Sequence, residues 1–219
     1  MDFNWARVLG HWHLGSAVGL VFLFVGAASA TAADWPGFRG PEVNGQSKET
    51  GVLSGQGSFG LRVVWKTSIG SGYSGVAVAK NRVVTMFADG ASDVAAAFDA
   101  RTGRELWRFT IGNTYAGHDG SHTGPISTPV IADGRVYGLG AWGRLFALDI
   151  QSGSLLWSTQ LVDDQMAAKP HYGFGTSPLM MDGVLVVQIG AEGGALAGFD
   201  PKTGKRLWAT CEDKVGYQS

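Results

Sequence analysis

Hydrophobic and polar positions along the middle of the chain change at strand-length intervals, with turn residues between them. STPVIADGRVYGLGA (127–141) and TSPLMMDGVLVVQIGA (176–191) each place Asp-Gly between two apolar stretches, a pattern typical of a β-hairpin. SGVAVAKNRVVTMFA (74–88) has the same arrangement with Lys80-Asn81 at the bend. The run VLVVQI is almost continuously apolar, which favours strands covered on both faces. The pattern predicts three hairpins of buried strands.

A ten-residue segment follows each hairpin: FDARTGRELW (98–107), LDIQSGSLLW (148–157) and FDPKTGKRLW (199–208). The copies lie about 50 residues apart, a period typical of solenoids, propellers and arrays. Each copy has an Asp, a Ser or Thr three residues later, a Gly at the fourth position and a Trp at the eighth: Asp99, Thr102, Gly103 and Trp107; Asp149, Ser152, Gly153 and Trp157; Asp200, Thr203, Gly204 and Trp208.

The repeated segment has the chemistry of a tight hairpin. An Asp side chain accepts hydrogen bonds from backbone N–H groups just downstream, and Ser or Thr does so more weakly. Gly supplies the positive φ of a four-residue loop that ends in a bulge. We call residues 99–103, 149–153 and 200–204 the repeat turns, and the Asp at the start of each is expected to be structural rather than catalytic.

Two linked hairpins per period give four strands per period. Four-stranded antiparallel sheets arranged around an axis are the blades of a β-propeller. A linear array or a β-sandwich is the alternative, although a sandwich would show cleaner alternation of polar and apolar positions. The sequence therefore predicts an all-β fold with about three complete blades.

The N-terminal region has the features of a secretory signal peptide, predicted over residues 1–30. The apolar run 14–27 precedes small-residue cleavage patterns such as Ala-Ser-Ala at 28–30. An uncleaved membrane anchor is the alternative, but a spanning helix needs ~20 apolar residues. We therefore expect a periplasmic or secreted protein with no membrane span after cleavage, an extended leader over 31–60 and propeller repeats over 61–219.

Composition limits the classes of partner and the kinds of covalent link that the protein can have. The net charge is −1 with 16% charged residues, which gives no electrostatic basis for nucleic-acid binding. The chain has 34 Gly and 8 Trp, as expected for a turn-rich β protein packed with aromatic rings. Cys211 is the one cysteine, so a disulfide within the chain is impossible, and no Cys stands at the cleavage site to carry a lipid anchor.

The pattern A-x-D-x-x-T-G-x-x-x-W resembles the tryptophan-docking repeat of quinoprotein-type β-propellers. That family includes pyrroloquinoline quinone (PQQ) dehydrogenases and the propeller lipoprotein of the outer-membrane β-barrel assembly machinery. The leader DWPGFRGPEVNGQS (34–47) is similar to the start of exported "PQQ-binding-like β-propeller repeat" proteins. The resemblance implies that Trp107, Trp157 and Trp208 stack on the turn of an adjacent blade, with the repeat-turn glycines beneath rings.

The resemblance also implies an eight-bladed parent, which would need a longer chain. Trp65 is predicted to lie on an outermost strand with no repeat turn before it, and VGYQS (215–219) resembles the start of a further innermost strand. The sequence is interpreted as the N-terminal part of a longer propeller. A ring built from two copies and an open arc are the alternatives, the last disfavoured by its exposed edges.

Two connections between blades hold candidate ligand-binding side chains. NTYAGHDGSHTGP (113–125) carries His118, Asp119 and His122, and VDDQMAAKPHYGFG (162–175) carries His171. Adjacent blades would bring these loops near each other. Neutral imidazoles are good metal ligands, so these side chains could form a metal or ligand site. His-x₃-His outside a helix is a weak pattern, however, and no metal site is predicted. The alternative to a binding site is that these polar side chains only solvate the loops.

The resemblance implies PQQ with calcium as a possible cofactor. Family dehydrogenases have a calcium site, a catalytic Asp and, in many members, a vicinal Cys pair. One Cys excludes the pair here, and no carboxylate cluster has calcium-loop spacing. No catalytic residue is therefore assigned. The leading hypothesis is a non-enzymatic binding or scaffold module with an envelope protein or carbohydrate partner; the alternative is a PQQ-dependent dehydrogenase whose catalytic residues lie in a missing C-terminal part.

Overall fold

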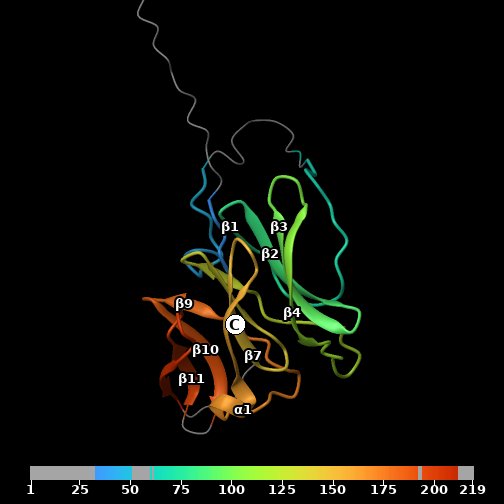
Figure 1. The fold of residues 1–219 in the computed structure, drawn as a ribbon. Coiled ribbons are helices and arrows are strands. Elements are labelled where there is room, and N and C mark those ends of the chain that lie inside the picture. Colours follow the sequence, from blue (N-terminus) through green and yellow to red (C-terminus); the bar gives the residue numbers. More distant parts are fainter. Residues whose placement is uncertain (1–32, 51–59, 61, 192–193, 212–219) are drawn as a thin grey trace, which may run out of the picture. The chain divides into compact units, whose positions relative to one another are not determined.

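The computed structural model describes residues 33–50, 60, 62–191 and 194–211 (Figure 1). The predicted signal peptide (1–30) and VGYQS (215–219) lie outside these residues. Within the described part of the chain, no helix has the length and apolar character needed to cross a bilayer.

The described residues form three four-stranded antiparallel sheets, each with its strands in chain order. The first contains β1 (Ala77–Ala79), β2 (Arg82–Asp89), β3 (Ser92–Asp99) and β4 (Glu105–Asn113). The second contains β5 (Val130–Ala132), β6 (Arg135–Leu139), β7 (Arg144–Asp149) and β8 (Leu155–Gln160), followed by the helix α1 (Leu161–Gln165). The third contains β9 (Leu179–Met181), β10 (Val184–Ala191), β11 (Gly194–Phe199) and β12 (Arg206–Thr210).

The first strands of the three sheets are neighbours: β1 contacts β5, and β5 contacts β9. Three consecutive four-stranded sheets that meet through their first strands are propeller blades. The predicted all-β propeller fold with three complete blades is confirmed. Residues 62–70, where a partial blade without its first three strands is predicted at Trp65, belong to none of the three sheets.

The hairpins between the first two strands of each sheet have the predicted turn residues. Asp133 and Gly134 have φ of 47° and 76°, and they join β5 to β6 with Ala132 opposite Arg135. The bends at 80–81 and 182–183 also have positive φ at both central residues. Two consecutive residues with φ > 0 define the type I′ turn, whose twist matches that of the flanking strands.

The core lies between the sheets, and β7 is covered on both faces. Phe146 and Leu148 pack toward the first sheet, whereas Leu145 and Ala147 pack toward the third, and all four are fully buried. The run VLVVQI on β10 differs from the expectation of two covered faces. Its alternate side chains toward the second sheet are buried, but Val184, Val186 and Gln188 are half-buried because none of the described residues forms a sheet beyond the third.

The leader is attached to the first strands of the first two blades. Trp35 and Val78 of β1 exchange two backbone hydrogen bonds of 2.7 Å, and the Ile131 N–H donates to Pro36 O. Gly40 has φ of 78° and lies against the ring of Trp35. These bonds occupy backbone groups of β1 and β5.

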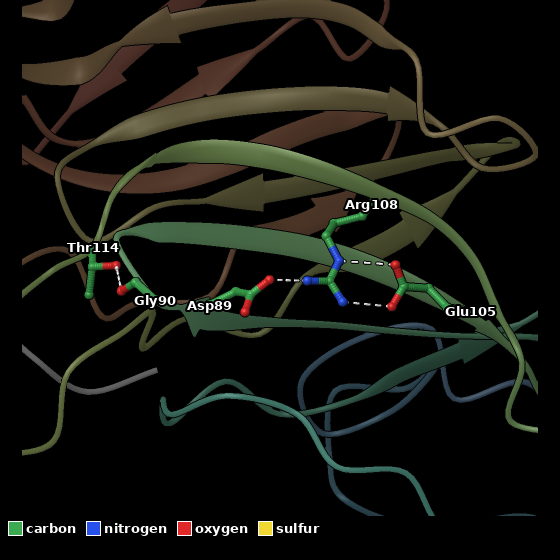
Figure 2. Close-up of polar contacts among 5 residues, drawn as sticks. All are labelled: Asp89, Gly90, Glu105, Arg108 and Thr114. Carbon is green, nitrogen blue, oxygen red and sulfur yellow. Dashed lines mark hydrogen bonds and ion pairs between the residues drawn. The ribbon is translucent and has the colours of Figure 1, made fainter.

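The outer face of the first sheet carries a charged network (Figure 2). The Arg108 guanidinium donates to Asp89 and, through Nη2, to Glu105 Oε2 at 2.7 Å, and it lies 5.4 Å from the centre of the Phe87 ring. Thr114 Oγ1 donates to Gly90 O at 2.9 Å, which fixes the start of the loop after β4. The Arg108 ion pairs are solvent-exposed, so they contribute little to stability.

Candidate functional site

Each sheet has two ends with different chemistry. The repeat turn joins the third strand to the fourth at one end. Because the fourth strand runs back antiparallel, the loop that follows it leaves from the opposite end of the sheet. We call these the turn end and the loop end.

At the turn end, the repeat-turn aspartates accept hydrogen bonds from the backbone just downstream. Asp149 Oδ1 accepts hydrogen bonds from the N–H groups of Gln151 (3.0 Å) and Ser152 (2.8 Å) and from Ser152 Oγ (2.9 Å). These bonds, the Ser152 N–H first, lower the pKa of Asp149 below its ordinary value. Hydrogen bonds from Thr102 do the same for Asp99, and those from Lys202 and Thr203 for Asp200.

Indole rings cover the repeat-turn glycines of the following sheet. Trp107 lies over Gly153, and its Nε1 donates to Ile150 O at 2.9 Å. The two other described contacts of this kind place Trp65 over Gly103, bonded to Ala100 O, and Trp157 over Gly204, bonded to Pro201 O. A Cβ added to these glycines would lie 2.5 or 2.6 Å from the ring. The turns therefore need glycine for closeness as well as for positive φ.

Trp208 occupies the same repeat position but lies in a different environment. Its ring lies against Gly198, its cross-strand neighbour, where a Cβ would be 2.2 Å away. The two other sheets have Ala97 and Ala147 at this position. Trp208 is 39% exposed, whereas Trp107 is 8% exposed. Among the described residues no repeat turn follows Trp208.

At the loop end, the loops 113–125 and 162–175 meet. The imidazoles of His118 and His171 stack with their centroids 4.8 Å apart and an interplanar angle of 21°. Asp119 Oδ2 lies 3.8 Å from His171 Nε2 and accepts a hydrogen bond of 3.3 Å from the Tyr172 hydroxyl. The structure thus brings together three of the four candidate residues from the sequence, and all three are exposed.

The fourth candidate, His122, lies apart from His118 and His171. Its backbone N–H donates to the Tyr73 hydroxyl at 2.9 Å, and its ring centroid lies 6.0 Å from that of Tyr73. Sequence proximity to His118 placed it in the same group, but the loop turns between them at Asp119 and Gly120, which both have positive φ.

Two aromatic residues that sequence reasoning missed extend the pair. Tyr115 is buried, and its ring makes edge contacts with His118 (5.9 Å) and with Trp142 of the β6–β7 turn (5.2 Å). Lys169 Nζ lies 4.1 Å from the centre of the Trp142 ring. We call Tyr115, His118, Trp142, His171 and Tyr172 the loop-end cluster.

A buried carboxyl group supports the cluster. Asp93 is 1% exposed at the start of β3, and its Oδ2 accepts the Tyr115 N–H at 3.1 Å, while its Oδ1 has no hydrogen-bond partner among the described residues. Burial raises the pKa of Asp93 to about 6. One signal could have identified it: Asp93 is a charged residue beside the apolar run VAAAF.

The described residues do not fit the calcium–quinone site that the resemblance raised. No group of three or more His, Cys, Asp or Glu residues in the described ranges is arranged to hold a metal ion. Cys211 is exposed and is the one cysteine of the chain. The side chains at the loop end can instead hold a ligand through ring faces and hydrogen bonds.

Comparison with known proteins identifies the family. A family model described as "Outer membrane protein assembly factor BamB" matches residues 61–214. The chain belongs to this PQQ-like β-propeller repeat family. The match includes all three sheets and both loops of the loop-end cluster.

Two curated relatives are alcohol dehydrogenases that are much longer than the matched region. The quinohemoprotein alcohol dehydrogenase ADH IIB of Pseudomonas putida is 33% identical over 116 residues, which cover 51% of this chain and 16% of that enzyme. The quinohemoprotein alcohol dehydrogenase of Comamonas testosteroni is 25% identical over 84% of this chain and 26% of its own length. The chain therefore spans about a sixth to a quarter of these relatives.

Among solved structures, BamB from Moraxella catarrhalis matches 62% of this chain and 35% of its own, with a TM-score of 0.43 and 23% identity.

Proposed function

We propose that this chain is an exported, non-enzymatic binding module that uses the loop end of its blades as its binding surface. The observation that carries the proposal is the meeting of loops from two adjacent blades in one exposed cluster of rings, His118 stacked on His171. Loops on a rigid scaffold are the usual place for binding residues. A family that includes an outer membrane assembly factor supports an envelope partner.

Repetition supports assigning binding to the loop end. The turn end repeats the same residues in every blade, and its glycines and aspartates are occupied by backbone and indole contacts. The loop-end residues occur once, and the side chains of His118, His171 and Tyr172 are exposed. Exposed aromatic side chains held in fixed positions favour binding, because they lose little conformational entropy when a partner docks.

The proposal is tested by capture from a bacterial envelope extract with the tagged chain as bait. The His118→Ala/His171→Ala variant is expected to lose a partner that the unmodified chain retains, and the partner is then purified and titrated directly. Arg108→Ala is the matched control because it removes an exposed side chain from the outer face of the first sheet (Figure 2). A direct titration with equal affinity for all three proteins contradicts the proposal.

A PQQ-dependent alcohol dehydrogenase is the second candidate, and the quinohemoprotein relatives are the observation that favours it. The discriminating assay incubates the full-length protein, including any sequence that continues beyond residue 219, with PQQ and calcium and measures dye-linked oxidation of primary alcohols. We expect no turnover above the protein-free rate. Quinone-dependent turnover would overturn the binding-module proposal.

A further inference from the structure

A groove of about 450 Å³ lies at the loop end beside the loop-end cluster. Its volume is in the range of ~300–1,000 Å³ common for small-molecule sites. Three residues of β4 line it together with one indole, one guanidinium and a second carboxamide, and its lining has no carboxylate: Ile111, Gly112, Asn113, Trp142, Arg144 and Gln160.

Trp142 is an exposed ring held in place. It is 39% exposed, yet Tyr115 contacts it edge-on and Lys169 lies over its face. The turn that carries it is tied by the Gly143 N–H to Gly140 O (2.8 Å) and by Gln160 Nε2 to Trp142 O (2.7 Å). A rigid aromatic surface of this kind binds without a large ordering cost.

The polar groups of the groove suit neutral hydroxyl groups better than ions. Arg144 Nη1 donates to Ile111 O at 2.8 Å, and its guanidinium lies 5.1 Å from the centre of the Phe109 ring, so its donors are partly committed. The Asn113 side chain is exposed and has no hydrogen-bond partner within the described residues. Carboxamides both donate and accept, which matches a hydroxyl group, since a hydroxyl does the same.

We propose that this groove binds a carbohydrate, with the apolar C–H face of a sugar ring against the part of the Trp142 indole that Lys169 does not cover, and with its hydroxyl groups on Asn113 and Gln160. An aromatic platform beside neutral amides is complementary to a pyranose, which is apolar on its faces and polar at its rim. Lys169, which lies over Trp142, forms no ion pair within the described residues, so the carbohydrate probes include an acidic one. This inference rests on the proposed binding role of the loop end and names its ligand class.

The test titrates the purified chain by calorimetry with three probes: cellohexaose, chitohexaose and hexagalacturonate. At least one is expected to bind with a Kd at or below about 1 mM. Trp142→Ala should weaken that binding by about tenfold or more, and Trp142→Phe should retain part of it. Trp208→Ala is the matched control because it removes a ring of equal exposure from the third sheet, and its affinity should stay within about twofold.

Two results overturn the inference: no heat from any of the three probes, or equal loss of affinity in the Trp142→Ala and Trp208→Ala variants. Circular dichroism shows whether each variant keeps its β-sheet spectrum, and Trp142→Phe answers the question if the alanine variant unfolds. If envelope capture depends on His118 and His171 but no sugar binds, this inference alone fails. Quinone-dependent turnover would contradict the proposed function, whether or not a sugar binds.

Discussion

The two ends of the same sheets use similar residues in opposite ways. At the turn end, Asp149 accepts three hydrogen bonds and its pKa is lowered, and Trp107 is 8% exposed with its N–H satisfied. At the loop end, Asp93 is buried with a raised pKa and with one oxygen that has no hydrogen-bond partner among the described residues, and Trp142 is 39% exposed. At the turn end, the polar groups of these side chains have their hydrogen-bond partners, and the arrangement is repeated. At the loop end, the contacts of these side chains are incomplete among the described residues, and the arrangement occurs once.

This difference separates stability from binding. In repeat architectures, stability is approximately a sum of repeat terms and nearest-neighbour interfaces. The indole contacts of the repeated turn end and the core between the sheets supply those interface terms. The loop end can then hold side chains whose contacts are incomplete among the described residues, which is the usual condition of a binding surface.

The largest effect is expected from Trp107→Ala. This change removes a buried ring from the interface of the first two sheets and leaves a cavity over Gly153, so the free energy of unfolding should fall by about 3–5 kcal/mol. Trp142→Ala should cost less than about 1 kcal/mol, because that ring is exposed. Urea unfolding followed by circular dichroism measures both. Equal losses would remove the distinction between the two ends.

Gly153→Ala is expected to cost about 3 kcal/mol. The new Cβ would lie 2.6 Å from the Trp107 ring and adds strain at φ of 70°. Gly134→Ala is the matched control, because Gly134 has φ of 76° with nothing within 4 Å of an added Cβ. It should cost about 1 kcal/mol from backbone strain. The excess in Gly153→Ala measures the ring contact, and no excess would show that the indole moves away without cost.

Asp93 should give the protein a pH dependence of opposite sign to that of the repeat turns. Its folded pKa of about 6 is above the ordinary value, so between pH 4 and 6 the folded state keeps a proton that the unfolded state loses. Its contribution to stability is therefore fully present below about pH 4, and about 2–3 kcal/mol is lost as the pH rises to about 6.

Asp93→Asn should abolish this loss and make the protein more stable than the unmodified chain at pH 7, as unfolding curves at several pH values will show. Asp149 acts in the opposite direction, because its lowered pKa stabilises the folded state at neutral pH and that contribution is lost in acid. A steady rise of stability from pH 4 to 7 in the unmodified chain would contradict the role given to Asp93.

The turn end could be predicted from the sequence because its determinants are local and occur three times. Asp, Ser or Thr, and Gly within five residues specify a turn by their own hydrogen bonds and φ values, and the period reveals the sheets. The loop end could be predicted only as two nearby loops. Tyr115 and Trp142 are distant in sequence and meet through tertiary packing, and no local pattern marks that contact.

The separation of His122 from His118 and the exposure of Trp208 also depend on tertiary structure. A tryptophan at the correct repeat position still needs a turn from a following sheet, and no described residue supplies one to Trp208. The sequence specified the residue, but its environment is set by what packs against it.

The smallest expected effect is that of Gly198→Ala, which restores the residue type of Ala97 and Ala147 at that position. The new Cβ would meet the Trp208 ring at 2.2 Å, but this ring is exposed and can move outward. The free energy of unfolding should change by less than about 0.5 kcal/mol, while acrylamide quenching of tryptophan fluorescence increases. Trp208→Phe/Gly198→Ala should show no such increase. A loss of stability as large as that of Gly153→Ala would mean that Trp208 packs as tightly on its own sheet as Trp107 does on the next.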